Sequence, residues 1–401
     1  MLILRIYVQN FLCRYAVFFF SMSKEQFYFL IFTNLCILRP SAEISVSFPR
    51  DLKLMKTIVI FRHGMRAPVK SFKFDPFAES DLQNVWPEGL DALVNEGKNQ
   101  MFLLGKRLRE RYEHLLKPYG STLAEDVQMV TTASDRCYQS GALVLAGFYP
   151  PNSDQIWNDE LLWQPISIHS PSPDKVHIKF GDKKECPRYH EEYEKALHII
   201  MRNGSDTKVN HDFLMNFLAN FSHSDNITSF SDLVLVGDYM KIKKSSNLKL
   251  PNWASDDFLD KLNRFHLDGL NSVIYNPELR EMIVGPLIKD ILDRIQDVMD
   301  DYSNNSKFYF YAGHDLSLMA LFEHFNMKND FVPTYESSFI FEVYRSFNGT
   351  YSIRSLFSDD YSLEHINVKV LQNCEIFCSA SKFFQIFEKY LTLDWKKICN
   401  L

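Results

Sequence analysis

The sequence has 401 residues, with 44 Lys and Arg against 50 Asp and Glu, and a formal net charge of −6. This length suits one large domain or two medium ones, and a hydrophobic fraction of 46% is ordinary for a protein with a sizeable core. The slight acidic excess argues against a nucleic-acid partner, because nucleic-acid surfaces usually carry a concentrated basic excess.

The N-terminal end differs in pattern from the rest of the chain. The apolar run "FYFLIFTNLCIL" at 27–38 follows a lysine and precedes small residues up to Ala42. This order is typical of a secretory signal, so we expect residues 1–42 to be a removable extension. A membrane span is a weaker interpretation, since charges interrupt every stretch of about 18 residues, and no stable membrane anchor is predicted. Whether translation starts at Met1 or Met22 stays open.

The first half of the remaining chain alternates strand and helix patterns. "TIVIF" at 57–61 predicts a fully buried strand, and residues 90–116 predict a long amphipathic helix. "VQMVT" at 127–131 predicts the next strand, and "DRCYQSGALVLAG" at 135–147 the next helix. Alternation of this kind is typical of an α/β sandwich.

The middle of the chain, residues 151–284, lacks this alternation. It is rich in Pro, Asn, His and aromatic residues at first, and its pattern is helical over about 256–282. We therefore predict a helical cap inserted between two parts of an α/β core, 45–150 and 285–401.

The last part of the chain returns to a sheet pattern. A helical pattern at 285–301 precedes the strand-like "FYFYAG" at 308–313. "FIFEVY" at 339–344 and "YSIRSLF" at 351–357 flank "RSFNGT", whose Asn-Gly pair is a strong hairpin signal.

The first candidate site follows the strand at 57–61. Arg62, His63 and Arg66 surround Gly64, which allows a tight turn and close approach. In α/β sheets ligands bind beyond the carboxyl ends of strands. Unpaired buried charges are costly, and arginine binds phosphate oxygens in pairs, so a dianionic ligand explains the cluster. A surface turn with salt bridges is the alternative.

Two further segments repeat this design. His314 and Asp315 follow the strand at 308–313 at the predicted start of a helix, where a negative ligand is favoured. Asp315 could equally be a helix N-cap. Arg136 also follows a predicted strand. Each of these signals is weak alone.

Together the segments resemble the histidine acid phosphatase family, branch 2 of the histidine phosphatase superfamily. "RHGMRAP" at 62–68 and "HD" at 314–315 match its two motifs. "WPEGLDALVNEGKNQMFLLGKRLRERY", "CPRY", "GPL" and "VPTYESSFIFE" follow in family order. The resemblance implies a three-layer α/β/α sandwich with a mixed, mainly parallel sheet, and a smaller, mostly helical cap domain.

The resemblance also implies the chemistry. An acid phosphatase of this kind hydrolyses phosphate monoesters through a phosphohistidine intermediate, with His63 as nucleophile and Asp315 as proton donor. The phosphoryl oxygens would be bound by Arg62, Arg66, Arg136 and His314. No metal or other cofactor is implied, because the arginines supply the positive charge. A carboxylic acid as proton donor suits an acidic pH optimum.

The sequence departs from the family pattern in places. Ala133 stands where an Asp is common, and "HDLSL" lacks the Thr that often follows the Asp. Cys137 is expected to be a buried thiol. Inositol-polyphosphate phosphatases of the same branch carry His-Ala-Glu, so the His-Asp pair favours the general acid phosphatases, which are secreted or lysosomal.

Cysteines and sequons agree with an oxidising compartment. Cys374 and Cys378 could close a small loop, although buried thiols are an alternative. The resemblance implies the pairs Cys186–Cys399 and Cys374–Cys378. Candidate glycosylation sequons lie at Asn203, Asn220, Asn226, Asn304 and Asn348.

Other readings compete with a general acid phosphatase. One is a dedicated phosphatase for a lipid or glycan phosphate, and another is a secreted, non-catalytic binding protein on the same fold. A metal site is a further alternative, but the histidines do not have the spacing of metal ligands. The expected partner is a small phosphate monoester, and a homodimer is expected from the family.

Overall fold

The computed structural model describes residues 51–116, 126–170, 186–202, 204–219, 227–300 and 306–401, together with the backbone of two short N-terminal strands. These strands, β1 (Arg5–Val8) and β2 (Phe11–Arg14), form an antiparallel pair. The apolar centre of the expected signal, 27–38, lies outside the described residues. The unit that follows, Asp51–Leu401, carries the fold described below.

A mixed sheet forms the centre of this unit. Its order is β10-β8-β7-β3-β6-β4-β5, with β9 beside β8. The parallel strands are β3 (Leu52–Arg62), β6 (Phe308–Gly313), β4 (Val127–Thr131) and β5 (Ile168–His169). The antiparallel strands are β7 (Ser338–Ser346), β8 (Tyr351–Ser358), β9 (Asn367–Lys369) and β10 (Cys378–Ser379).

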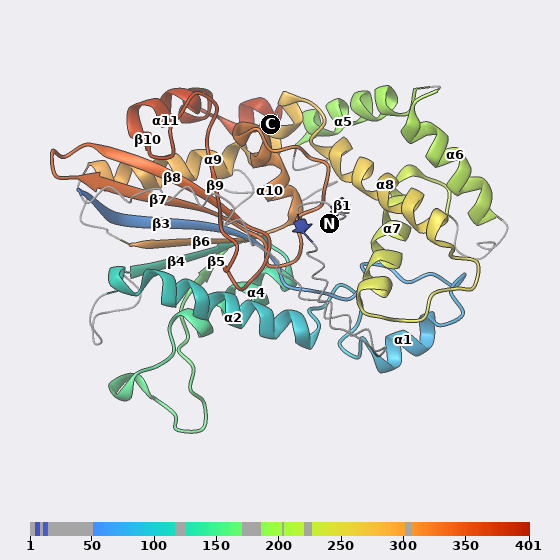
Figure 1. Ribbon diagram of the computed structural model, residues 1–401, viewed down its shortest axis with the longest axis horizontal. Helices are drawn as coiled ribbons and strands as arrows, with labels where there is room; N and C mark the ends of the chain where they lie inside the picture. Colours follow the sequence, from blue (N-terminus) through green and yellow to red (C-terminus); the bar gives the residue numbers. More distant parts are fainter. Residues whose placement is uncertain are drawn as a thin grey trace, which may run out of the picture. The chain divides into compact units, whose positions relative to one another are not determined.

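Helices cover both faces of the sheet, as Figure 1 shows. One face carries α2 (Asn95–Tyr112) and α4 (Asp135–Phe148). The other carries α9 (Pro277–Met299), α10 (Asp315–Phe322), α11 (Ala380–Ile386), α12 (Glu388–Leu391) and α13 (Trp395–Ile398).

Successive residues of β3 bury their side chains on opposite faces, as strand geometry requires. Ile58 and Ile60 join the apolar cluster under α9 and α10, whereas Val59 and Phe61 join the cluster under α2 and α4. Burial on both faces explains the continuous apolar run in the sequence. The predicted α/β/α sandwich is confirmed.

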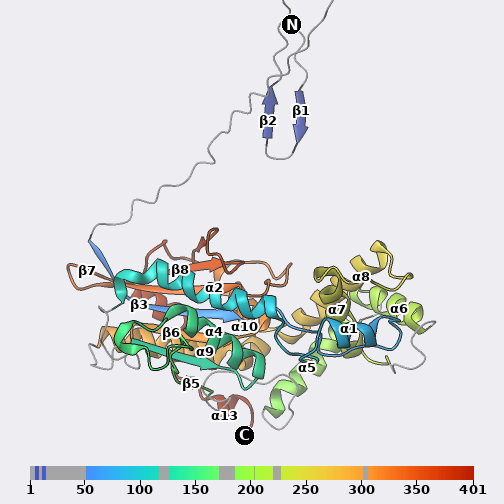
Figure 2. The same cartoon turned by 90° about the horizontal axis from the view of Figure 1, so that it is seen from below.

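A helical region adjoins the sheet (Figures 1 and 2). It comprises α1 (Ala78–Asn84), α5 (Pro187–Ile200), α6 (Asp206–Ala219), α7 (Phe230–Ser245) and α8 (Asp256–Val273). Its apolar cluster also takes in Phe72, Phe74 and Trp86, which precede the middle of the chain. The cap boundaries predicted at 151–284 stay a prediction.

The helical pattern predicted over 256–282 is split between two helices. α8 ends at Val273, and α9 begins at Pro277. The Asn276 side chain accepts a hydrogen bond from the Leu279 amide, and proline fits the first helical position, so both residues start a new helix.

A buried ion cluster ties the segment after the first motif to α7. Tyr239 Oη donates to Asp75 Oδ2 over 2.7 Å, and Lys243 Nζ contacts both Asp75 and Asp81. Lys243 is 0% exposed, so its charge depends on these carboxylates. The segment carrying α1 is thereby held on the helical region.

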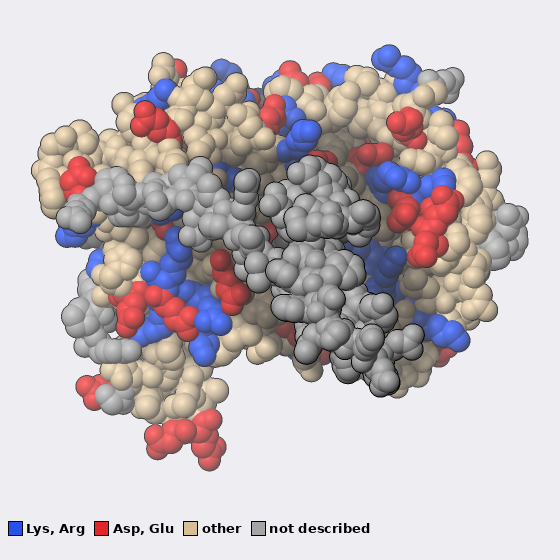
Figure 3. Space-filling model, in the orientation of Figure 1, with Lys and Arg blue, Asp and Glu red and all other residues tan. Residues whose placement is uncertain are grey.

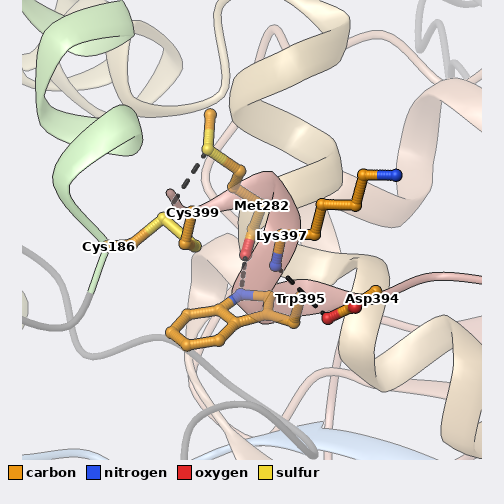
Figure 4. The surroundings of a disulfide bond; sticks show 6 residues. All are labelled: Cys186, Met282, Asp394, Trp395, Lys397 and Cys399. Atoms are coloured by element: carbon orange, nitrogen blue, oxygen red, sulfur yellow. Dashed lines mark hydrogen bonds between the residues drawn. A yellow bond between two sulfur atoms is a disulfide. The ribbon is translucent and has the colours of Figure 1, made fainter. Parts of the chain in front are cut away.

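The structure contains both implied disulfides, Cys186–Cys399 and Cys374–Cys378, while Cys137 is a buried thiol. The first joins the start of α5 to the residue after α13, beside Trp395, whose indole N–H donates to the Met282 carbonyl over 3.2 Å (Figure 4). Asn348 lies exposed in the β7–β8 hairpin turn. The sequons at Asn203, Asn220, Asn226 and Asn304 lie outside the described residues.

The surface carries charges of both signs. Figure 3 shows acidic and basic side chains interspersed on one face of the molecule. Within the described ranges, no helix has the length and apolarity needed to cross a membrane.

Candidate active site

The candidate residues meet at one edge of the parallel sheet. Arg62 at the end of β3 is in register with Gly313 at the end of β6, and Thr131 of β4 with Ala312 of β6. The residues that follow these strands therefore emerge side by side, where α/β sheets bind ligands.

His63 is buried at this edge, with 2% of its surface exposed. Its Nδ1 lies 2.9 Å from the Gly64 carbonyl oxygen. A carbonyl only accepts, so we assign the proton of the neutral ring to Nδ1, which leaves the lone pair on Nε2. Burial, with Arg136, His314 and the other nearby arginines, holds the pKa of His63 well below its usual range. This lowered pKa favours the neutral imidazole.

Gly64 allows α2 to approach the motif. A Cβ on Gly64 would lie 2.7 Å from the Gly97 carbonyl oxygen and 2.8 Å from Met101 Cγ. A Cβ on Gly97 would lie 2.2 Å from the Met65 carbonyl oxygen. Both glycines are needed for this contact, which supports the loop that carries His63.

Arg62 links the first motif to the second. Its Nη2 lies 2.9 Å from Asp315 Oδ2, and its guanidinium stacks 4.2 Å from the Tyr335 ring centre. Its Nη1 donates to the Pro333 carbonyl oxygen. These contacts hold a buried guanidinium in one orientation.

Arg66 is held by α7 of the helical region. Its two terminal nitrogens donate to the two carboxylate oxygens of Asp238, each over 3.0 Å. Such a paired arrangement is a strong, directional contact. Arg66 Nε also lies 3.5 Å from Asp91 Oδ1.

Arg136 and His314 form a connected pair. Arg136 Nη2 lies 3.3 Å from His314 Nδ1, and His314 Nε2 lies 3.0 Å from Thr132 Oγ1. Arginine only donates, so His314 accepts at Nδ1 and its proton is assigned to Nε2. The His63 and His314 rings are 5.4 Å apart, which brings both motif histidines into one site.

Asp315 is the first residue of α10. Burial alone would raise its pKa, but the Arg62 guanidinium, the neighbouring His314 and the Leu316 amide lower it to about 2. The Asp315 side chain is therefore a carboxylate at mildly acidic and neutral pH.

The structure thus brings together all six predicted residues of the site: Arg62, His63, Arg66, Arg136, His314 and Asp315. It adds residues that sequence reasoning did not select. Asp91, Tyr335 and Glu336 lie inside sequence blocks that resemble the family, so those blocks were a usable signal. Asp238 lies in α7, and nothing in the sequence distinguishes it from the many other acidic residues of the middle of the chain.

Glu336 supports the first motif. Its Oε1 accepts a hydrogen bond from the Met65 amide over 3.1 Å. Burial raises the pKa of Glu336 to about 8, although the Met65 amide and Arg62 oppose this rise. The carboxyl is therefore protonated at acidic pH.

Comparison with known proteins shows where this architecture belongs. Residues 53–358 match the model of the histidine phosphatase superfamily, branch 2. Bovine (Bos taurus) prostatic acid phosphatase is 28% identical over 93% of this chain and 96% of its own length. Human (Homo sapiens) lysosomal acid phosphatase is 29% identical over 93% of this chain and 84% of its own length.

Solved structures agree in fold. The apo form of Hafnia alvei phytase superposes with a TM-score of 0.60 and 16% identity, covering 88% of this chain and all of the phytase chain. With sequence relatives, family match and site geometry in agreement, the chain belongs to branch 2 of the histidine phosphatase superfamily and is a phosphomonoester hydrolase.

Proposed function

We propose that the chain hydrolyses phosphate monoesters through a phosphohistidine formed at His63 Nε2. The observation that carries this proposal is the 2.9 Å contact between His63 Nδ1 and the Gly64 carbonyl oxygen, at the sheet edge where three arginines also lie. Nε2 attacks phosphorus, the bond from phosphorus to the ester oxygen breaks, and that oxygen takes a proton from Asp315. Water then attacks phosphorus, Asp315 accepts a proton, and the phosphorus–nitrogen bond breaks.

Arg62, Arg66, Arg136 and His314 would bind the phosphoryl oxygens during both steps. Phosphoryl transfer depends mainly on positioning and charge neutralisation. Three guanidinium groups can supply this positive charge, so we expect turnover without an added metal.

The protonation states support an acidic optimum. Asp315, with its pKa lowered to about 2, is ionised before substrate binds and must gain a proton before donating one. A phosphate monoester with a second pKa of about 6 is a monoanion at acidic pH and brings that proton with it. The bound phosphate also competes for Arg62, which raises the pKa of Asp315. His63 stays neutral at the same pH because its own pKa is lowered.

The test uses protein beginning near Ser45 and produced in a secreting host. Hydrolysis of p-nitrophenyl phosphate would be followed from pH 3 to 9 with EDTA, in the wild type, His63→Ala and Asp315→Asn. We expect turnover that is greatest at acidic pH, resists EDTA and is lost in His63→Ala. A folded wild type without turnover on this ester or on a panel of phosphomonoesters would contradict the proposal and favour a non-catalytic binding protein.

The class of natural substrate distinguishes a general acid phosphatase from a dedicated one. A dedicated lipid- or glycan-phosphate phosphatase would share all the groups described above. A panel of lipid phosphates, sugar phosphates and simple aryl phosphates separates the two cases. A general enzyme hydrolyses all three classes with kcat/KM values within about tenfold, whereas a dedicated one prefers its class by about a hundredfold or more.

We place the chain in the secretory pathway, either secreted or lysosomal. Support comes from the two disulfides, from exposed Asn348, and from similarity to a lysosomal acid phosphatase. Expression in mammalian cells, followed by glycosidase digestion and separation of medium from lysosomes, decides between the two destinations.

We also propose a homodimer. The loop between α4 and β5 extends away from the sheet (Figure 1) and exposes Trp157 by 55%, Leu161 by 47% and Leu162 by 66%. Such clustered exposure of large apolar side chains favours a protein contact. Sedimentation of the wild type should give a dimer and that of Leu162→Asp a monomer, whereas a monomeric wild type would contradict the proposal.

A further inference from the structure

Asp91 lies between two of the proposed phosphate-binding arginines. Its Oδ1 is 3.5 Å from Arg66 Nε, and its Oδ2 is 2.5 Å from Arg136 Nη1. The carboxylate therefore occupies contacts that a phosphoryl group would use. Its side chain is 39% exposed, which places it at the edge of the site rather than beneath it.

The backbone holds Asp91 in this place. Its amide donates to the Pro68 carbonyl over 2.9 Å, the Ala67 amide donates to the Ala92 carbonyl over 2.8 Å, and the Val94 amide to the Met65 carbonyl over 3.0 Å. Backbone hydrogen bonds thus hold the segment after Gly89 against residues 65–68 of the first motif. An Asp91 side chain beside Arg66 follows from this pairing.

The conformation of Asp91 is itself uncommon. Its φ of 62° lies in the left-handed region, which side chains other than those of Asn and Asp adopt at some cost. Glycine would fit this backbone without strain. An aspartate can therefore hold this backbone conformation with little strain.

The carboxylates around the arginines have different tasks. Asp238 accepts hydrogen bonds from both terminal nitrogens of Arg66. Asp315, the proposed acid, forms an ion pair with Arg62. Asp91 adds a single contact to Arg136, while Arg66 is already held. When all are ionised, the pairs Arg62–Asp315, Arg66–Asp238 and Arg136–Asp91 carry no net charge. Without Asp91 the group would carry one positive charge.

We propose, on the basis of the proposed function, that Asp91 determines affinity by competing with phosphate for Arg136 and Arg66. Its negative charge repels the incoming phosphoryl group and weakens the binding of both substrate and the product, inorganic phosphate. The site thus releases phosphate more readily than one in which Arg136 has no carboxylate partner. A carboxylate that merely supported the arginines would have the opposite effect, because its loss would loosen them.

The test compares Asp91→Asn with the wild type at pH 5.5. Asn keeps the shape and an acceptor oxygen but removes the charge. The inhibition constant of inorganic phosphate against p-nitrophenyl phosphate should fall about tenfold, with KM falling alongside it, as expected for removing one partly screened charge beside the ligand. Asp91→Gly, which fits the left-handed backbone, should also lower the inhibition constant of phosphate and KM.

Glu88→Gln is the matched control. Glu88 lies on the same segment and pairs with Lys98 at the surface, so its loss also removes one negative charge. Its phosphate inhibition constant should equal that of the wild type. Thermal unfolding of each variant checks that it is folded.

The outcomes separate this inference from the proposed function. A wild type that lacks turnover on every phosphomonoester would overturn the proposed function itself. A wild type that turns over and is inhibited by phosphate, with an unchanged or higher inhibition constant in Asp91→Asn, would overturn only the role of Asp91.

Discussion

Arg62 Nη2 and Asp315 Oδ2 lie 2.9 Å apart, so a proposed phosphate-binding group and the proposed proton donor form one ion pair. The pair connects β3 to the start of α10. It keeps Asp315 ionised, so the proposed mechanism requires Asp315 to gain its proton when substrate binds.

The pH dependence of kcat/KM should therefore follow the substrate rather than the enzyme. Asp315 has its pKa lowered to about 2, and that of His63 also lies well below its usual range, so neither group titrates near neutral pH. We expect kcat/KM to fall about tenfold per pH unit above the second pKa of the monoester, near pH 6, as the monoanion is lost. Two esters whose second pKa values differ by about one unit should give profiles displaced by the same amount. Coincident profiles would assign the titration to the protein instead.

Asp238 should matter for both activity and stability, although it lies on α7, far from the motifs in sequence. Asp238→Ala leaves the buried Arg66 guanidinium without its paired acceptor, which costs about 3–5 kcal/mol in comparable buried pairs. We expect urea unfolding to show this loss and kcat/KM to fall about a hundredfold. Asp232→Ala, at the start of the same helix, where Asp232 completes the capping box with Ser229 and pairs with Lys70, is the control for a lost carboxylate outside the site. Equal effects of the two variants on kcat/KM would contradict the account.

Glu336 should make stability depend on pH in a defined direction. Its folded-state pKa is raised to about 8, above the unfolded value, so the folded protein binds the extra proton between about pH 4.5 and 8. The stability that it contributes is complete below that window and is lost as pH rises through it. Glu336→Gln mimics the protonated form, so its Tm relative to the wild type should increase from pH 4.5 to pH 8. The same Tm difference at both pH values would show that Glu336 does not titrate in this range.

The two disulfides should contribute unequally to stability. Cys186 and Cys399 are 213 residues apart in sequence, whereas Cys374 and Cys378 are 4 apart. A cross-link between distant residues restricts the unfolded chain more, so replacing Cys186 and Cys399 by Ser should lower the free energy of unfolding by about 2–5 kcal/mol. Replacing Cys374 and Cys378 by Ser should cost clearly less. Denaturant unfolding of the two double variants measures both, and a larger loss from the short loop would refute this expectation.

The parts of the fold that could be predicted are those with local signals. β3, β4 and β6 are apolar runs buried on both faces, and the Asn-Gly turn marks the β7–β8 hairpin. Because these parallel strands end at one edge, the residues that follow them could be predicted to meet. The six candidate site residues were predicted from these strand ends together with the resemblance of their motifs to the family.

The rest depends on contacts between distant residues. Asp238 is 172 residues from Arg66, and nothing in the sequence near either residue indicates their pairing. Asp91 is positioned by a backbone ladder to residues 65–68, which only the folded chain displays. The break between α8 and α9 is set by Asn276 and Pro277, a local signal that the helical pattern on either side obscured.

The most direct test of the central claim is to trap the covalent intermediate. Wild type and His63→Ala would be mixed with a ³²P-labelled monoester at pH 5, quenched within milliseconds and digested under alkaline conditions, which preserve phosphohistidine. The account predicts alkali-stable, acid-labile label on the peptide that contains His63 in the wild type, and none in His63→Ala. Label on another residue, or undiminished turnover by His63→Ala, would contradict it.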